Sequence, residues 1–130
     1  MNRYAVTISL VLIGMSAQCA LAQNYPARTI RLVVPSSPGG SSDILARILA
    51  QKLGDALGQQ VVVDNRAGAS GVIGVDLVAK AAPDGYTLVL TQTSIAINPS
   101  MFKKLPYDAM RDLAPISRIV EGPNLLAVHP

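Results

Sequence analysis

The chain has 130 residues, of which 50% are hydrophobic, 15% charged and 4% aromatic. This length suits one domain or part of a larger one, and the low charge with high apolar content excludes a wholly disordered chain. The net charge of +3 comes from scattered basic residues without interleaved aromatic side chains, which argues against a nucleic-acid surface. One cysteine and one histidine exclude a disulfide framework and a Cys/His zinc site.

The N-terminus has the layout of a secretory signal peptide. Arg3 supplies the positive charge, residues 5–14 form an apolar segment, and Ala20-Leu21-Ala22 matches an A-x-A cleavage site. The alternative is an uncleaved membrane anchor, but the apolar segment is shorter than the ~20 residues that span a bilayer. We therefore expect cleavage after Ala22 and a periplasmic mature chain that starts at Gln23.

A lipid anchor is the second alternative at this end of the chain. Cys19 is the only residue that such an attachment could use. Gln18, directly before it, is bulkier than the small residue that a lipid-attachment site usually has. This alternative is therefore less favoured than simple cleavage.

Three runs of β-branched and apolar residues predict buried strands over residues 29–34, 60–64 and 87–91. Pro35 ends the first run because proline cannot continue a strand ladder. A Pro-Asp-Gly turn at residues 83–85 precedes the third run.

A helix is predicted between the first two strands, over residues 41–57. Ser41 or Ser42 can cap its N-terminus, and Asp43 places a negative charge in the first turn, where it is favoured. Gly58 fits a C-terminal stop. The residues at helical spacing that form its apolar face are Ile44, Leu45, Ile48, Leu49, Leu53, Ala56 and Leu57.

A second helix is predicted over residues 72–81, with Ile73, Leu77 and Val78 on one face. Strands that alternate with helices in this order pair in parallel through right-handed crossovers. The carboxyl ends of all three strands then meet at one edge of the sheet, where open α/β sheets bind ligands. The loops that arrive there are rich in Gly, Ser and Thr and poor in charge: residues 36–42, 65–71 and 92–94.

The pattern is less regular after residue 95. Residues 97–102 predict a short helical turn, and residues 114–120 and 125–128 predict two more strands. No helix follows the last strand before Pro130, so we expect a mature chain that is cut short.

The Gly-rich loops have two interpretations. Backbone amides at a helix N-terminus stabilise a carboxylate or phosphate by roughly 0.3–1 kcal/mol. Alternatively, Gly39, Gly40, Gly68 and Gly71 only permit tight turns. Two such loops on one sheet edge favour the ligand interpretation.

Known catalytic and phosphate motifs do not match. There is no P-loop ending and no G-x-G-x-x-G after a strand. The stretch 68–72 resembles a nucleophile elbow around Ser70 but has Val72 in place of its last glycine, and His129 has no identifiable partner. The carboxylates show no paired or metal-ligand spacing. We predict no catalytic residue, metal site or cofactor; an exported serine hydrolase that uses Ser70 is a disfavoured alternative.

A set of short motifs extends from Tyr25 to the end of the chain: Tyr25-Pro26, Ile30-Arg31-Leu32-Val33-Val34-Pro35, Pro38-Gly39-Gly40-Ser41-Ser42-Asp43, Ala46-Arg47, Asn65-Arg66-Ala67-Gly68-Ala69, Ala79-Lys80-Ala81-Ala82-Pro83-Asp84-Gly85-Tyr86-Thr87-Leu88, Ala96-Ile97-Asn98-Pro99 and Leu105-Pro106-Tyr107-Asp108. Together they resemble the Bug family, the TctC-like extracytoplasmic solute receptors of tripartite tricarboxylate transporters. Any one of the motifs alone is weak, whereas the set is highly specific.

The resemblance implies an α/β fold that is the first lobe of a two-lobed periplasmic-binding-protein fold, with a largely parallel sheet and truncated. On this basis the chain divides into a signal peptide (1–22), the first segment of lobe 1 (23–113) and crossover strands toward a missing lobe 2 (114–130). The implied function is a solute receptor for a small organic mono-, di- or tricarboxylate, not an enzyme. The implied partners are that ligand and the membrane subunits of the transporter.

The resemblance also implies which residues bind the carboxylate, through backbone amides, hydroxyls and ordered water. The first loop supplies Ser37, Gly39, Gly40, Ser41 and Asp43, with Asp43 more a helix cap than a ligand contact. The second loop supplies Ala67, Gly68, Ala69 and Ser70. The segment after the third strand supplies Thr91, Thr93 and Ser94.

The sequence departs from the family pattern at three places. Ser36 replaces a usual aromatic residue, and Ala67 and Ser70 replace a usual Pro and Gly. The chain also covers less than half of a usual member. The remaining alternative is therefore a truncated remnant with no binding function of its own.

Overall fold

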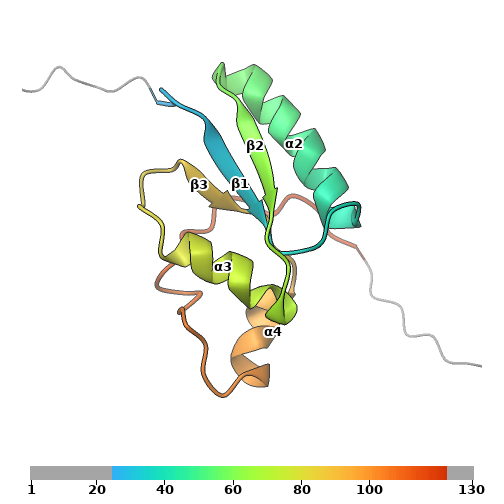
Figure 1. Cartoon of the computed structure of the whole chain (residues 1–130), viewed down its shortest axis with the longest axis vertical. Coiled ribbons are helices and arrows are strands. Elements are labelled where there is room, and N and C mark those ends of the chain that lie inside the picture. The colour runs from blue at the N-terminus through green and yellow to red at the C-terminus, as the bar shows by residue number, and fades with distance from the viewer. Residues whose placement is uncertain (1–24, 123–130) are drawn as a thin grey trace, which may run out of the picture.

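The computed structural model describes residues 25–122, and the signal peptide and the strand predicted at 125–128 lie outside this range (Figure 1). The elements in chain order are β1 (Ile30–Val34), α2 (Ser41–Leu57), β2 (Val61–Asn65), the short 3-10 turn η2 (Ala69–Gly71), α3 (Val72–Ala79), β3 (Thr87–Val89) and α4 (Ser94–Met101). The three strands predicted at 29–34, 60–64 and 87–91 and the first helix are confirmed to within two residues at each end. None of the helices between residues 25 and 122 is long and apolar enough to cross a membrane.

The strands form a parallel sheet in the order β2-β1-β3. Leu32 of the central strand pairs with Val63 on one side and Leu88 on the other. Helix α2 follows the central strand β1. Helices α3 and α4 follow the outer strands β2 and β3 and contact each other. The strand order therefore reverses at β1, and open α/β sheets bind ligands outside the carboxyl ends of the strands at such a position.

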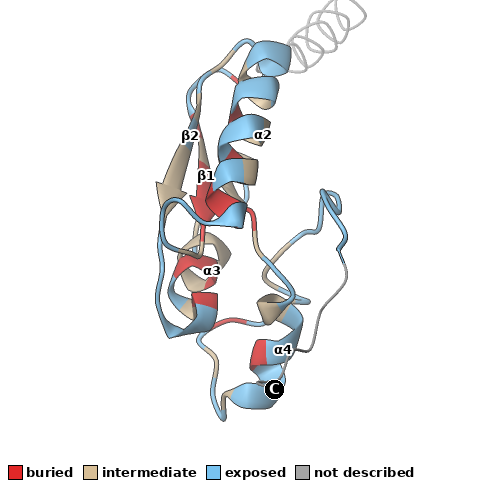
Figure 2. Cartoon of the chain, turned by 90° about the vertical axis from the view of Figure 1, so that its right-hand side faces the viewer, coloured by how far each residue is buried: buried red, intermediate tan, exposed pale blue. Residues whose placement is uncertain are grey.

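One face of the sheet packs against α2 through small residues. Leu32 and Val34 of β1 form a buried cluster with Ala46, Ala50 and Leu90. The buried face of α2 differs from the predicted one, because Ile44 and Ile48 are each 56% exposed. Alanine side chains are small, so they let the helix approach the sheet closely and leave room for the side chains of the strands. The buried residues of α2, which include Ala46 and Ala50, therefore face the sheet. Figure 2 shows the buried and exposed parts of this helix.

The other face of the sheet packs against α3. Val33, which alternates with the α2-facing residues of β1, and Val75 of α3 are both almost fully buried. Gly74 permits the close approach, since a Cβ on it would lie 2.9 Å from the Arg66 carbonyl oxygen. Of the residues predicted to share one face of this helix, Leu77 and Val78 are half-buried, whereas the Ile73 side chain is 54% exposed.

The strand predicted at residues 114–120 is not formed. A run of apolar residues becomes a strand only when its backbone groups pair with a neighbour, and this segment pairs with none of the strands in residues 25–122. Ile116 is 81% exposed and Val120 is 68% exposed. The helical turn predicted at 97–102 begins earlier and forms α4.

Candidate functional site

The predicted loops meet at the carboxyl ends of the strands. Asn65, at the end of β2, donates its side-chain amide to the Ser36 carbonyl oxygen at 3.2 Å. Gln92, after β3, donates to the Ser42 hydroxyl at 2.6 Å. These two bonds tie the second and third loops to the first. The sequence prediction that the loops share one edge is therefore confirmed.

The first loop is organised by the carboxylate of Asp43. Its Oδ2 atom accepts from the Gly39 backbone N–H at 2.9 Å and from Arg47 Nε at 3.0 Å. Gly40 is the N-cap of α2, without a side-chain cap, so the prediction that Ser41 or Ser42 caps this helix was wrong. Asp43, in the first turn, instead reaches back to Gly39, the residue before the N-cap.

Asp43 remains ionised next to the candidate ligand edge. The hydrogen bond from the Arg47 guanidinium and then that from the Gly39 N–H lower the pKa of this carboxyl from its ordinary 3.8 to about 2. Its side chain is only 5% exposed. The Gly39 amide is already used by this carboxylate, so a ligand anion must find its donors elsewhere in the loops.

The two glycines of the first loop have different structural requirements. Gly39 has φ +82, a conformation that favours glycine. Gly40 has φ −79 and ψ 170, which any residue adopts, and a Cβ there would meet only the Ser37 carbonyl oxygen at 3.7 Å. The fold therefore demands glycine at 39 but not at 40.

The second loop is a left-handed turn. Every residue from Gly68 to Gly71 has positive φ, including the non-glycine residues Ala69 (φ 46) and Ser70 (φ 53). The Gly71 N–H closes the turn onto the Gly68 carbonyl oxygen at 2.9 Å. Successive backbone N–H groups in tight turns of this kind form anion-binding concavities.

The third segment also lies against the second. A Cβ on Gly71 would lie 3.2 Å from the Pro35 side chain and 3.8 Å from the Ser94 hydroxyl oxygen, so Gly71 lies between the first loop and the start of α4. Thr93 is exposed, whereas Thr91 and Ser94 are half-buried.

The predicted ligand-binding residues thus lie around one edge of the sheet, and most of them are exposed to solvent. Ser37, Gly39, Gly40 and Ser41 are exposed, as are all residues from Ala67 to Ser70. Asp43 is the exception, because its side chain is buried and bonded to Gly39 and Arg47; it does not cap the helix as expected. The part of each in ligand binding stays a prediction.

Sequence reasoning missed the amides that hold the loops together: Asn65, Gln92 and Asn98. The available signal was an amide side chain next to a buried strand or inside an apolar helix, where it needs a partner.

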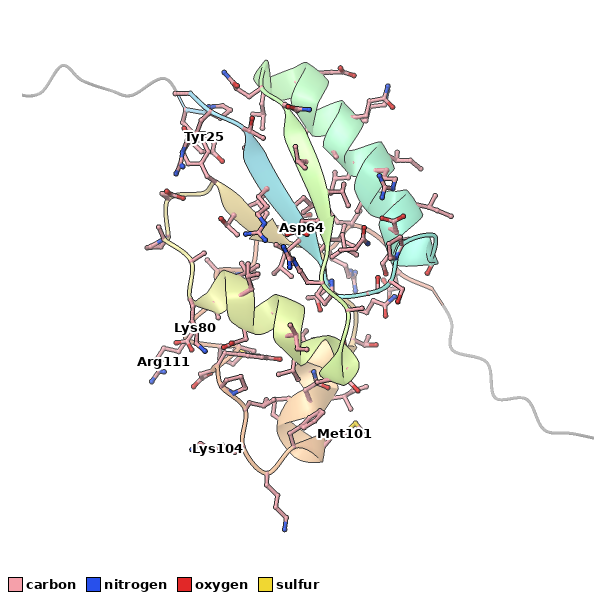
Figure 3. All side chains as sticks on the ribbon, viewed as in Figure 1. Tyr25, Asp64, Lys80, Met101, Lys104 and Arg111 are labelled. Atoms are coloured by element: carbon pink, nitrogen blue, oxygen red, sulfur yellow. The ribbon has the colours of Figure 1, made fainter. Side chains whose placement is uncertain are left out.

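A charged cluster borders the second loop on β2. Asp64, labelled in Figure 3, accepts from the guanidinium groups of Arg31 and Arg66. Partial burial would raise the pKa of Asp64, but the hydrogen bonds from these two arginines outweigh it and hold the pKa below its ordinary value. Between residues 25 and 122 no group of His, Cys, Asp or Glu side chains could hold a metal ion.

Comparison with known proteins identifies relatives along most of the chain. Residues 45–130 match the family described as "Tripartite tricarboxylate transporter family receptor". Protein BugT of Bordetella pertussis is 46% identical over 127 residues, which cover 96% of this chain but 39% of BugT. The chain therefore spans about two fifths of the length of this relative.

Solved structures share the fold. The periplasmic binding protein BugD matches with a TM-score of 0.63 at 43% identity, over 65% of this chain and 28% of BugD. A Rhodopseudomonas palustris protein solved with bound malate, MatC, matches with a TM-score of 0.59 at 35% identity, over 68% and 30% of the two chains. Another, R. palustris Rpa4515 with adipate, matches with a TM-score of 0.63 at 40% identity, over 66% and 29%.

The parallel sheet, the loops gathered at its carboxyl edge and these matches agree on one assignment. The chain belongs to the family of tripartite tricarboxylate transporter receptors, the Bug or TctC-like periplasmic solute-binding proteins.

Proposed function

We propose that this chain supplies the part of a two-lobed periplasmic receptor that holds one carboxylate of a small organic acid. The observation that carries the proposal is the left-handed turn from Gly68 to Gly71 after the carboxyl end of β2, in which the residues from Gly68 to Ser70 are exposed. The turn leads directly into α3, whose N-terminus adds the partial positive charge of a helix end, worth roughly 0.3–1 kcal/mol for an anion. The adipate and malate bound by two similar structures support this ligand class.

The loops offer hydroxyl and backbone amide donors. Ser37 and Ser41 in the first loop, Ser70 in the second, and Thr93 with Ser94 after β3 supply hydroxyl groups, and the backbone supplies amides. The charge of Asp43 is balanced by Arg47, so it does not repel the ligand as an isolated carboxylate would. A second lobe would complete the hydrogen bonding of the ligand.

The family assignment supports the wider role. We infer that residues 1–22 direct export to the periplasm, that residues 23–113 form the first segment of lobe 1, and that residues 114–130 lead toward the second lobe. The membrane subunits of a tripartite tricarboxylate transporter are the proposed partners, and the proposed role is binding, not catalysis. The hydrolase alternative rests on Ser70 and on His129, which lies outside the described residues.

A glycine substitution tests the ligand site. In BugT carrying this chain in place of its matching residues, Gly40→Val should weaken malate or adipate binding about ten- to a hundredfold, because the branched side chain crowds the loop surface and one charge-assisted hydrogen bond is lost. The fold tolerates the change, since residue 40 has extended backbone and an open Cβ direction. Isothermal titration calorimetry measures the affinity.

The matched control is Gly122→Val, at a glycine with nothing within 4 Å of its Cβ direction and away from the loops. Its affinity should equal that of the parent. Unchanged affinity in Gly40→Val with an intact fold would mean that the first loop is only a turn.

A further inference from the structure

Helix α4 contains a buried amide that its own sequence does not explain. Asn98 is 1% exposed, and its Nδ2 atom donates to the Ser70 carbonyl oxygen at 3.2 Å. Burying an amide is unfavourable unless its hydrogen bonds are made, so this position is held by its partner in the left-handed turn.

Local preferences oppose the conformation on both sides of this bond. Pro99 follows within α4, removes one helical hydrogen bond and disfavours the helical conformation of Asn98. Ser70 and Ala69 have positive φ, a conformation that is unfavourable for residues other than glycine. Contacts between distant segments must therefore stabilise both the helical conformation of Asn98 and the positive φ of the turn residues.

The bond fixes one peptide group from two sides. The Ser70 carbonyl oxygen accepts from Asn98, and the N–H of the same peptide, on Gly71, donates to the Gly68 carbonyl oxygen at 2.9 Å. The orientation of this peptide group determines where the preceding amides of the turn point.

Resting on the proposed function, we propose that Asn98 is a positioning residue of the ligand site. Its amide holds the peptide between Ser70 and Gly71 in one orientation, and so keeps the turn in the left-handed form that presents its amides to a carboxylate. Asn98 itself does not contact the ligand, because it is buried behind the turn.

The test removes the donor and keeps the shape. The chain is expressed with its signal segment and purified from the periplasm as wild type, Asn98→Asp and Gln51→Glu, the last being an amide-to-acid control on the exposed part of α2. At pH 7, the amide exchange rate of Gly71 by NMR should rise about three- to tenfold in Asn98→Asp and not in Gln51→Glu. The carbon chemical shifts of Ala69 and Ser70 should also leave the values typical of positive φ.

A second substitution separates this role from general stability. Ser70→Gly relieves the positive-φ cost, so adding it to Asn98→Asp should return the Gly71 exchange rate to within about twofold of Ser70→Gly alone. If Asn98→Asp does not fold, Asn98→Leu, which is similar in size and uncharged, replaces it in every comparison. Unchanged exchange and shifts, or no recovery with Ser70→Gly, would overturn the proposal.

Ligand titration links the turn to binding. Where the wild type binds malate or adipate, Asn98→Asp should weaken that affinity by the same three- to tenfold factor, and equal affinity would overturn the positioning role. A wild type that binds neither acid would contradict the proposed function for these ligands, while the exchange and rescue measurements would still decide whether Asn98 orders the turn.

Discussion

The Asp43 side chain reduces the number of hydrogen-bond donors that are free at the candidate ligand edge. Its carboxylate occupies the Gly39 amide at the start of α2 and pairs with Arg47. The loop before α2 therefore has one backbone donor fewer for an external carboxylate. The left-handed turn of the second loop therefore becomes the better candidate for the main anion contact.

The pairing of Asp43 predicts an acid-dependent stability. Because the folded-state pKa is about 2 and the ordinary value is 3.8, the stabilisation is present above about pH 4 and is lost as the pH falls toward 2. The difference in melting temperature between wild type and Asp43→Asn should be largest near pH 6 and shrink toward pH 2. Circular dichroism melts over pH 2–7 measure it.

The control is Asp55→Asn, an exposed carboxylate on the same helix. Its difference from wild type should remain small throughout the pH range. A difference for Asp43→Asn that does not change between pH 6 and pH 2 would contradict the prediction.

Gly74 predicts a steric effect where α3 meets the loops. An alanine Cβ would lie 2.9 Å from the Arg66 carbonyl oxygen and 3.0 Å from Pro35 Cβ, and neither atom is at the end of a flexible side chain. Gly74→Ala should lower the free energy of unfolding by about 1–3 kcal/mol. Urea denaturation measures it, with Gly122→Ala, which meets nothing within 4 Å, as the control. Equal stability of both variants would show that α3 can shift without loss.

At the scale of elements, α2 shows how local chemistry sets helix ends. The helix ends at Leu57 because Gly58 adopts φ +66 and returns its N–H to the Gly54 carbonyl oxygen at 3.0 Å. The two glycines of this last turn have opposite conformational demands.

They predict effects of opposite sign for the same substitution. Gly54→Ala should raise the free energy of unfolding by about 0.5–1 kcal/mol, because alanine favours the helix interior and its Cβ makes only an ordinary contact with Gln59. Gly58→Ala should lower it by about 1–2 kcal/mol, since alanine is disfavoured at positive φ. Thermal and urea unfolding of the pair measures both, and a shared sign would contradict the assignment of the helix end.

At the scale of the whole molecule, the first described residues are hydrogen-bonded to the segment before β3. The Tyr25 hydroxyl donates to the Gly85 carbonyl oxygen at 2.8 Å, and the Tyr86 hydroxyl accepts from the Ala27 N–H at 2.8 Å (Figure 3 labels Tyr25). Arg28 covers the ring of Tyr86 at 4.3 Å. These contacts lie at the amino ends of the strands, away from the ligand edge.

Export predicts the first residue of the mature chain. With the A-x-A site in use, intact-mass analysis of periplasmic material should show a chain that begins at Gln23. Material that begins at Met1, or that carries a lipid on Cys19, would contradict cleavage after Ala22.

Self-association is the prediction for residues 23–130 expressed alone. Within residues 25–122, β2 and β3 each pair only with β1, and Ile116, Ile119 and Val120 are exposed. Open strand edges and exposed apolar side chains promote association. We expect a marginally stable, associating chain whose affinity for di- and tricarboxylates is no tighter than millimolar, about −4 kcal/mol.

Size-exclusion chromatography and calorimetry test this. The double variant Ile116→Lys, Val120→Lys should elute later than the parent, whereas Met110→Lys, at a 93% exposed residue outside the apolar segment, should not. A monodisperse parent with micromolar affinity for one acid would make this chain a self-sufficient receptor.

The sequence by itself determined the order of elements, the parallel sheet and the edge at which the loops meet. These depend on local preferences, such as the β-branched strand runs and the stop at Gly58, and on the fixed hand of crossovers. It also located the two Gly-rich loops, because glycine and serine residues between a strand and a helix are typical of turns and loops.

Only the tertiary structure decided which face of α2 is buried, how Asp43 is paired, and that residues 114–120 form no strand within the described part of the chain. It also decided the left-handed form of Ser70 and the burial of Asn98. Each of these features depends on tertiary contacts. The space beside the sheet, or a hydrogen bond to a backbone carbonyl, then overrides the local conformational preference of the residue. Hydrophobic periodicity reports that a helix has an apolar side, but the neighbour it meets decides which part of that side is buried.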